Sequence, residues 1–537
     1  MSGPPAAATP ALRRAVLLLF ALLLLLRLAA ATRLELFGDE AFYWLCAQHP
    51  APAYADHPFM TAMSVRLGTA LFGDTPLGVR APFLLFGALL PWAVFALARP
   101  VVGSRDAWLA AGASVALPLL AIVGAVAVPD VPLLLLAAGT ALGFERATRT
   151  GRPGAWLFAG ACAGLGMCTH YRFVLVLGGA GGYLLLTRQG RSTWRTPGPW
   201  LASALAAAGL LPLLLFNLQL HWQPLLYQSE GRHAATDGPI AWLLHPLQQA
   251  AVVTPLLYAA LLVALWRAAT AARTGDHRRA LLAWFALVPL GTYWVMAPFS
   301  DTGHDFVHWP AVGYLPLLPL LPGVLRDWAS RGRAGLVAAR LAPALGLGVA
   351  LLVFVDVATG VPGLRSLHGP FDGWDELAAA ARMRLPATTS DAAIARGRAA
   401  PGGGAPGGGA LVLADNYIAA SELQFRLGAD ADVYVARHPL NARHGRELQF
   451  QLWAHDEAAF RTRGGEPALI VEEVTEKPRP STREAWEARL ASLMDEVQPQ
   501  GSLEIRSGRR RFRFETGRVR EATDTAPALP PEARPPH

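Results

Sequence analysis

Carboxylates stand in short polar segments between long apolar runs of this 537-residue chain. Asp39 and Glu40 form the first acidic pair, and Asp130 interrupts apolar sequence in the run Pro129-Asp130-Val131-Pro132. A carboxylate can take the proton from an attacking hydroxyl group, so these three residues are our candidate catalytic groups. The alternatives are structural: the pair at 39 and 40 can begin a helix, and Asp130 can occupy a turn.

Cationic or titratable side chains occur in comparable segments. We interpret His57, Arg80, His170 and Arg172 as candidate ligands of a donor phosphate. Arginine binds phosphate oxygens through two parallel hydrogen bonds, and histidine can carry charge near neutral pH. The remaining polar and aromatic residues of these segments are expected to line a substrate pocket. They are Tyr43, Asp56, Tyr171, Arg232, His308 and Trp309.

Some of these side chains could instead bind a divalent cation, although the sequence identifies no cofactor with certainty. Asp56 with His57, or His304 with His308, would supply ligands of the right type. The two histidines would share one face if their segment were helical. The acidic run Asp430-Ala431-Asp432 mimics a metal-binding motif of nucleotide-sugar transferases, but a polar turn is the favoured interpretation.

The composition indicates that lipid is the solvent for much of the surface. The chain is 53% hydrophobic and 16% charged, whereas about a quarter of the residues of a soluble protein are charged. The net charge is +8, but the arginines lie between apolar runs and form no continuous stripe, which argues against nucleic-acid binding. Three cysteines cannot form a disulfide framework.

About eleven apolar runs are long enough to be candidate membrane spans. The first, preceded by Arg13 and Arg14, is interpreted as an uncleaved span. Arginines concentrate in alternate loops, which predicts a cytoplasmic N-terminus and places the polar segments and the last third of the chain outside. The runs are 13–32, 78–98, 107–127, 131–145, 154–169, 173–187, 199–217, 244–266, 280–298, 309–325 and 335–357.

The predicted domains follow from these runs. Residues 1–360 form the membrane domain, with a first outer loop at 33–77 that carries juxtamembrane helices. Residues 361–385 are an amphipathic connection, 386–410 a flexible Gly/Pro/Ala-rich insert and 522–537 a disordered tail. Between them, 411–521 is predicted to be a small α/β domain, with strands at 411–415, 432–436, 467–474 and 511–515 and a helix at 481–497.

Several of these segments together resemble the bacterial branch of the dolichyl-phosphate-mannose-protein mannosyltransferase superfamily, which includes aminoarabinose transferases acting on lipid A. The resemblance covers residues 12–330 well and 371–453 more loosely. Two departures are Phe59, where a proline is common, and the step at 170–172, where a lysine is frequent. The matching segments are 39–44, 56–58, 67–74, 78–80, 129–133, 170–172, 217–228 and 308–314.

The resemblance implies a GT-C fold, that is, a polytopic α-helical membrane protein, and a glycosyltransferase of the bacterial inner membrane. It implies an undecaprenyl- or dolichyl-phosphate sugar donor, an envelope acceptor on the periplasmic face and inversion at the anomeric carbon. Asp39 falls on the aspartate that serves the family as base or acceptor-orienting group, and Asp130 falls on its outer-loop aspartate. The carrier phosphate would lie near 56–58 and 170–172. The sugar, the acceptor (lipid A, polysaccharide or protein) and the oligomeric state stay open.

Two other classes of function compete with this hypothesis. A transporter or flippase of lipid-linked sugars would place charges at mid-membrane and show paired, symmetric halves. Here the polar segments gather at one predicted face and no repeat is evident. A noncatalytic envelope scaffold would depend on the C-terminal domain and not on the acidic loops.

Overall fold

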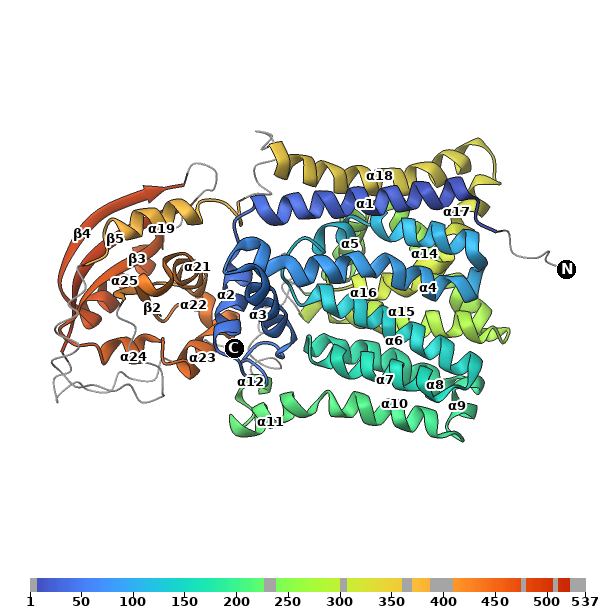
Figure 1. Cartoon of the computed structure of the whole chain (residues 1–537), viewed down its shortest axis with the longest axis horizontal. Helices are drawn as coiled ribbons and strands as arrows, with labels where there is room; N and C mark the ends of the chain where they lie inside the picture. Colours follow the sequence, from blue (N-terminus) through green and yellow to red (C-terminus); the bar gives the residue numbers. More distant parts are fainter. Residues whose placement is uncertain are drawn as a thin grey trace. The chain divides into compact units, whose positions relative to one another are not determined.

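The structure is a computed structural model that describes residues 7–226, 238–299, 307–359, 369–386, 409–474, 480–505 and 510–521. The chain divides into two compact units, Met1–His368 and Gly369–His537. The first is helical and the second contains a five-stranded sheet (Figure 1). The predicted insert (386–410) and tail (522–537) lie almost wholly or wholly outside the described residues.

The first unit begins with a long apolar helix, a pair of short helices and a second long helix. Local sequence sets their starts: Thr75 Oγ1 accepts the N–H of Gly78, and Pro76 occupies the first helical position, where a missing N–H costs nothing. The elements are α1 (Pro10–Arg33), α2 (Gly38–Gln48), α3 (Met60–Phe72), α4 (Pro76–Ala116), α5 (Pro118–Val123), α6 (Asp130–Thr150), α7 (Pro153–Met167) and a 3-10 turn η1 (Tyr171–Phe173).

The rest of this unit packs around the same core, which α4, α6, α7, α14, α15 and η4 share. Its elements are α8 (Val174–Leu186), α9 (Arg188–Thr193), α10 (Pro197–Ala208), α11 (Leu211–Gln219), α12 (Gln223–Leu226), α13 (Ala241–Val253), α14 (Pro255–Arg273), α15 (His277–Met296), η3 (Ala297–Phe299), α16 (Ala311–Tyr314), η4 (Leu315–Leu320), α17 (Leu321–Ala329) and α18 (Arg333–Thr359).

Backbone breaks correct some of the predicted spans. The run at 244–266 is not one helix, because Thr254 has a φ of +78° and separates α13 from α14. The run at 107–127 is divided at Leu117, before Pro118. Gly103 has a φ of +80° and interrupts α4. The interruption lies between the runs at 78–98 and 107–127, which the sequence predicted as two separate spans. Apolarity located these segments, but it does not detect a change of chain direction inside them.

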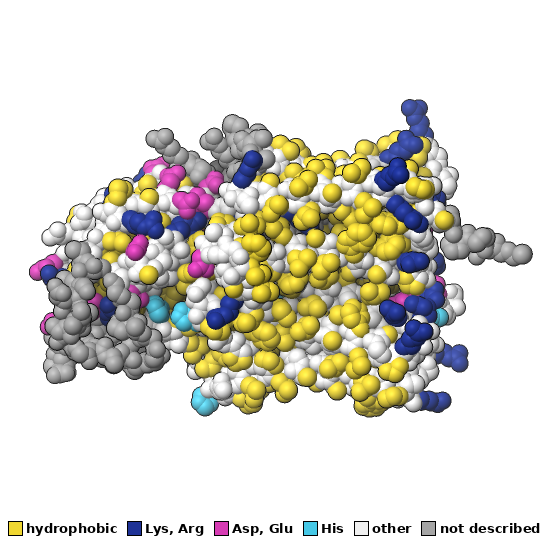
Figure 2. Space-filling view, viewed as in Figure 1, with side chains coloured by type: hydrophobic (Ala, Val, Ile, Leu, Met, Phe, Trp, Pro, Cys, Tyr) yellow, Lys and Arg dark blue, Asp and Glu magenta, His cyan; other side chains and the backbone are white. Residues whose placement is uncertain are grey.

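Six described helices are long and apolar enough to cross a membrane. They are Pro10–Arg33, Pro76–Ala116, Pro197–Gln219, Pro255–Arg273, His277–Phe299 and Arg333–Val357. Figure 2 shows hydrophobic side chains along the surface of the helical unit and basic side chains gathered at one end, where α9 and α17 lie. An apolar band with arginines at its border is typical of a membrane-embedded bundle.

The second unit is an α/β domain whose strands follow the order β2-β1-β3-β5-β4. β1 is parallel to β2 and β3, whereas β5 is antiparallel to β3 and β4. The elements are α19 (Trp374–Arg382), β1 (Ala410–Ala414), α21 (Tyr417–Leu427), η6 (Gly428–Asp430), β2 (Ala431–Val435), α22 (Pro439–Arg443), α23 (Arg446–Leu452), α24 (Glu457–Arg461), β3 (Pro467–Val474), α25 (Pro480–Leu493), β4 (Met494–Glu504) and β5 (Arg511–Val519).

The four predicted strands correspond to β1, β2, β3 and β5, but β4 was missed. The helix predicted over 481–497 ends at Leu493, and the chain continues as the edge strand β4. Nearly all residues of β4 are exposed, and its register with β5 shifts twice, once beside Pro499. An exposed edge strand with shifted register has no regular apolar alternation, so the sequence pattern does not reveal it.

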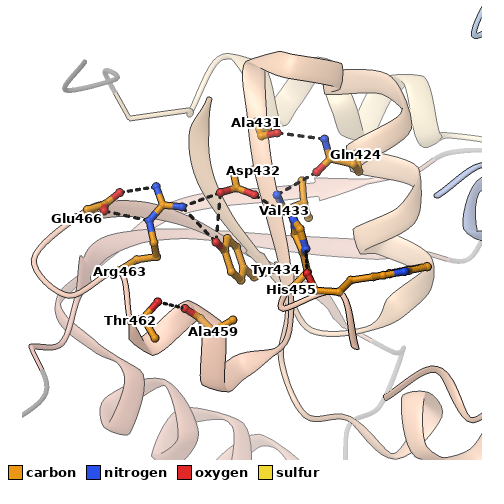
Figure 3. A network of polar contacts seen from close by, with 11 residues as sticks. Gln424, Ala431, Asp432, Val433, Tyr434, His455, Ala459, Thr462, Arg463 and Glu466 are labelled. Carbon is orange, nitrogen blue, oxygen red and sulfur yellow. Dashed lines mark hydrogen bonds and ion pairs between the residues drawn. The ribbon is translucent and has the colours of Figure 1, made fainter. Parts of the chain in front are cut away.

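Asp432, from the acidic run at 430–432, belongs to a compact polar network in this unit (Figure 3). Arg463 donates from Nη1 to Asp432 Oδ2 over 2.7 Å and pairs with Glu466 through two further hydrogen bonds. His455 Nε2 lies 3.3 Å from Asp432 Oδ1, and the Tyr434 hydroxyl donates to Oδ2 over 3.2 Å. Asp432 is therefore a structural carboxylate with several partners on β2 and the segments that follow it.

Candidate active site

Glu40 and Arg80 form a fully buried ion pair between α2 and α4. Arg80 Nε lies 2.8 Å from Glu40 Oε1, and both residues have 0% exposed surface. The remaining guanidinium N–H groups donate to the second carboxylate oxygen and to the backbone carbonyls of Ala31, Leu34 and Glu35. All five donors of Arg80 thus have acceptors within the protein. Its predicted role as a phosphate ligand does not fit this geometry, because binding would require breaking a buried pair.

Glu40 also connects the two acidic segments of the sequence. Its Oε1 accepts the backbone N–H of Ala127 over 2.7 Å, three residues before Asp130, and Oε2 accepts the N–H of Phe37. Asp39 precedes Glu40 in the first turn of α2 and is partly exposed. Glu40 is fully buried and its charge is paired with Arg80, so it is not accessible to a substrate. We interpret Glu40 as the group that joins the start of α2 to the segment that precedes Asp130.

Asp130 lies at the start of α6 and is 7% exposed. Arg172 Nη2 donates to its Oδ1 over 3.0 Å, and His308 Nε2 lies 3.5 Å from its Oδ2. Arg172 and His308 come from η1 and from the segment before α16, far apart in the sequence. Three of the predicted site residues therefore meet in one cluster, and the carboxylate balances part of the charge of its partners.

Aromatic rings enclose Arg172. Its guanidinium carbon lies 4.3 Å above the centre of the Trp309 ring, within the range of a cation–π contact. The His170 and Tyr293 rings lie 6.2 and 6.0 Å from that of Trp309. The buried Nε of Arg172 has no hydrogen-bond partner among the described residues. The ion pair with Asp130 and the Trp309 ring together fix the guanidinium plane.

Sequence reasoning missed the residues that hold the turn at 307–310. Gln249 on α13 donates from Nε2 to the carbonyl of Val307 over 3.0 Å, and its own oxygen accepts the Tyr314 hydroxyl over 2.9 Å. The structure describes His308 in a non-helical turn, whereas His304 lies outside the described residues, so their proposed i, i+4 pairing stays a prediction. A glutamine buried in an apolar run was the available signal for Gln249. Tyr293, inside an apolar helix, gave no comparable signal.

Asp56 and His57 form a second cluster. Asp56 Oδ1 and His57 Nδ1 are 2.6 Å apart, and the imidazole is packed between the rings of Tyr43 and Tyr54. His57 is only 1% exposed, and its Nε2 has no hydrogen-bond partner among the described residues. Direct contact with a donor phosphate would require this cage to open, and the phosphate role of His57 stays a prediction.

The two clusters adjoin through the first outer segment. The N–H of Met60, three residues after His57, donates to the carbonyl of Cys168, close to the step at 170–172. Tyr171 packs against the apolar cluster of Ala53, Leu213 and Phe216. Arg232 and His304 lie outside the described residues. Within the described part of the chain, no three or more His, Cys, Asp or Glu side chains gather as a metal-binding group. Asp56 and His57 lie together as a pair, and the predicted cation site stays a prediction.

The sequence profile of the dolichyl-phosphate-mannose-protein mannosyltransferase family matches residues 56–216. The lipid A galacturonosyltransferase RgtD of Rhizobium johnstonii is 28% identical over 263 residues, which are 47% of this chain and 53% of that protein. The chain thus spans about half the length of this curated relative.

The solved structure of ArnT from Cupriavidus metallidurans matches with a TM-score of 0.57, covering 93% of this chain and 97% of that one at 16% identity. The chain has the GT-C fold. A second ArnT structure, bound to undecaprenyl phosphate, gives the same values. The archaeal oligosaccharyltransferase AglB of Archaeoglobus fulgidus matches with a TM-score of 0.51 and 12% identity, over 85% of this chain and 69% of that one.

These matches confirm the resemblance and the fold class predicted from the sequence. They also agree with the apolar helices of the first unit, and the chain is a multi-pass membrane protein. At 16% identity the ArnT likeness transfers the architecture and not the residue roles. The roles of Asp39, Asp130 and their neighbours remain predictions that depend on the local geometry described above.

Proposed function

We propose that this protein transfers a sugar from a polyprenyl-phosphate carrier to an envelope acceptor at the periplasmic face of the bacterial inner membrane. The observation that carries the proposal is the junction of two acidic segments with a cationic one: Glu40 binds Ala127, and Asp130 binds Arg172. Asp39 is a partly exposed carboxylate in the same first turn of α2 as Glu40, and we infer that Arg172 binds the donor phosphate. The combination suits transfer from a phosphorylated carrier better than transport.

The chemistry assigns a task to each group. The hydroxyl oxygen of the acceptor attacks the anomeric carbon, and Asp39 accepts the proton that this hydroxyl loses. The bond from that carbon to the phosphate oxygen breaks, and the polyprenyl phosphate departs with the electron pair. Attack on the face opposite the phosphate inverts the anomeric configuration. Arg172, with His170 and His308 nearby, stabilises the charge that grows on the phosphate.

The remaining residues support these groups. Asp130 orients Arg172 through their ion pair, and Trp309 holds the guanidinium from its face. Glu40 and Arg80 hold the start of α2. Tyr43, Asp56 and Tyr171 belong to the neighbouring cluster, which we assign to the wall of the donor site.

The relatives narrow the substrates to test. RgtD is a lipid A galacturonosyltransferase by name, and one ArnT structure holds undecaprenyl phosphate. Lipid A is therefore our first acceptor, and undecaprenyl phosphate carrying galacturonic acid or aminoarabinose gives the first two donors. We place the arginine-rich end of the helical unit at the cytoplasmic face, following the positive-inside rule.

The test uses the full chain in lipid nanodiscs with each radiolabelled donor and lipid A. We expect label in lipid A with the wild type and about a thousandfold less with Asp39→Asn, because general-base catalysis typically contributes about 10²–10⁴-fold. The matched control is Asp74→Asn, an exposed carboxylate in the same outer segment, whose substitution still provides an acceptor for Trp44 Nε1. Full transfer by Asp39→Asn would remove Asp39 as the base.

The rival transporter predicts a different outcome. A flippase would move labelled carrier lipid across the bilayer of a proteoliposome without attaching label to lipid A. If the wild type gave movement and no transfer with any donor or envelope extract, the enzymatic proposal would be wrong.

A further inference from the structure

Arg27 is a buried cation with no part in the site described above. It lies within the apolar helix α1 and is 3% exposed. Its Nε donates to the carbonyl of Ala121 over 2.8 Å, and its Nη2 donates to the carbonyl of Leu120 over 2.6 Å. A charge within a membrane segment is costly and usually serves a function, so these contacts call for an explanation.

The two carbonyls belong to α5, a helix of six residues. Carbonyl groups in the last turn of a helix lack partners within the helix and carry its partial negative charge. Arg27 supplies both carbonyls with charged donors from another helix. Because so short a helix has little stability of its own, its position depends on contacts of this kind.

Two glycines make room for the guanidinium. A Cβ atom on Gly124 would lie 2.6 Å from Arg27 Cζ, and one on Gly87 would lie 2.9 Å from Nη1. Real Cβ atoms essentially never approach so closely, so an alanine at either position would push the guanidinium out of its place. The guanidinium occupies the space between Gly87 on α4 and Gly124 at the end of α5.

The segment held by Arg27 leads directly to Asp130. Ala125 and Val126 continue the turn after α5 through hydrogen bonds to the carbonyls of Ile122 and Val123. Ala127 is then bound by Glu40, and Val131 donates to the carbonyl of Val128. One end of the connection is thus fixed to α1 and its middle to α2, which carries Asp39.

We propose that Arg27 is a positioning residue, which sets the place of Asp130 relative to Asp39 by anchoring the segment 120–129. It touches neither substrate nor reacting atoms, and its effect on transfer depends on the function proposed above. Glu40 alone fixes one point of this connection and leaves it free to pivot about that point. A second anchor at α5 removes that freedom, and misplacement of a reacting group by about 1 Å can cost about 100-fold in rate.

The kinetic test compares Arg27→Met, Arg27→Lys and Gly124→Ala in the full chain. Methionine keeps an apolar side chain that a membrane helix accommodates readily, but it cannot donate to the carbonyls. We expect kcat to fall about tenfold or more while the KM for the carrier-linked sugar changes less than about twofold. Lysine should recover part of the loss. Alanine at 124 should reproduce the loss with Arg27 still present. Arg14→Met, an exposed arginine on the same helix, is the matched control.

A distance measurement tests positioning without relying on activity. Spin labels are placed at Gln48, the exposed end of α2, and at Val128, in a chain whose three cysteines are replaced. We expect a narrow distance distribution in the parent and a broader or shifted one in Arg27→Met. An unchanged distribution would overturn the proposal, even if transfer were lost. Absence of transfer in the wild type would count against the proposed function alone, because the distance measurement would still decide the role of Arg27.

Discussion

Asp130 in the helical unit and Asp432 in the α/β unit have similar partners but different surroundings. Each carboxylate faces one arginine and one histidine. Arg463 also binds Glu466 through two hydrogen bonds and contacts the Tyr434 hydroxyl, so its donors are largely used within the network (Figure 3). Arg172 has one carboxylate and one aromatic face, and its buried Nε has no hydrogen-bond partner among the described residues.

This difference in hydrogen-bond satisfaction separates a network that stabilises the fold from one that can bind a ligand. A buried polar group without a partner is costly, and native structures retain few of them. The Asp432 network lies on β2 and the segments immediately after it, where it ties neighbouring elements together. The Asp130 cluster draws its members from segments far apart in the sequence. Incomplete satisfaction of Arg172 is therefore the feature that we associate with the substrate phosphate.

The largest expected effect distinguishes the two aspartates directly. Asp130→Asn should lower kcat/KM by about 100-fold or more, because Arg172 loses the charged partner that orients it toward the leaving phosphate. Asp432→Asn should leave kcat/KM within about twofold. The measurement is initial-rate transfer to lipid A by purified variants. Equal losses from both substitutions would mean that the comparison does not separate catalytic from structural carboxylates.

The two arginines should respond differently to a change that keeps the charge. Arg172→Lys is expected to lower kcat/KM by about tenfold to 100-fold, since lysine cannot present a planar guanidinium to both a carboxylate and a phosphate. Arg463→Lys should leave transfer unaffected and lower thermal stability instead. Rates and unfolding curves are measured on the same preparations. An Arg172→Lys protein with wild-type kinetics would contradict the phosphate role.

Substitution of Arg463 should lower the free energy of unfolding more than substitution of Arg172, which is the opposite of their expected effects on transfer. Arg463→Met removes the charged partner of both Asp432 and Glu466, and we expect a loss of about 1–3 kcal/mol in the free energy of unfolding. Arg172→Met should cost less, because a ligand site is not completed in the free protein. Thermal unfolding followed by tryptophan fluorescence of the full chain provides the comparison. A larger loss at position 172 would assign Arg172 a mainly structural role.

The smallest effect is a pH dependence of the Asp432 network. Burial alone lowers the pKa of His455, but the hydrogen bond with Asp432 raises it above 6.5 overall. Burial raises the pKa of Asp432, yet His455 and Arg463 together bring it below 3.8. The contribution of His455 to the free energy of unfolding is present below pH 6.5 and is lost as pH rises through the folded-state pKa of His455. The contribution of Asp432 to the free energy of unfolding is present above pH 3.8 and is lost as pH falls through the folded-state pKa of Asp432.

The stability advantage of the wild type over Asp432→Asn should therefore be greatest between these two limits. We expect the advantage to shrink by roughly 1 kcal/mol or less on going to alkaline pH, where Arg463 remains as the charged partner. Unfolding curves at pH 5.5 and 8.5 measure the change. An advantage that grows toward alkaline pH would show that the His455–Asp432 contact is not an ion pair in the folded protein.

Much of the fold follows from patterns that a short stretch of sequence carries. Long apolar runs such as Pro10–Arg33 predict membrane helices whatever their neighbours are, because lipid leaves the backbone few alternatives to a helix. The buried strand at 467–474 was located with its observed ends. Breaks at Thr254 and the exposed strand β4 were missed, since each depends on how the chain turns or pairs and not on local apolarity.

For the site, the sequence determined which side chains were available but not how each is used. Asp39, Glu40, Asp130, Arg80 and Arg172 were all candidates by type, and the sequence treated the two arginines alike. Only the tertiary structure gives Arg80 five internal acceptors and leaves Arg172 incompletely satisfied, and only it joins Glu40 to Ala127. The physical reason is that hydrogen-bond satisfaction is a property of contacts between distant segments. A residue's type fixes what it can donate, and the fold decides what remains for a substrate.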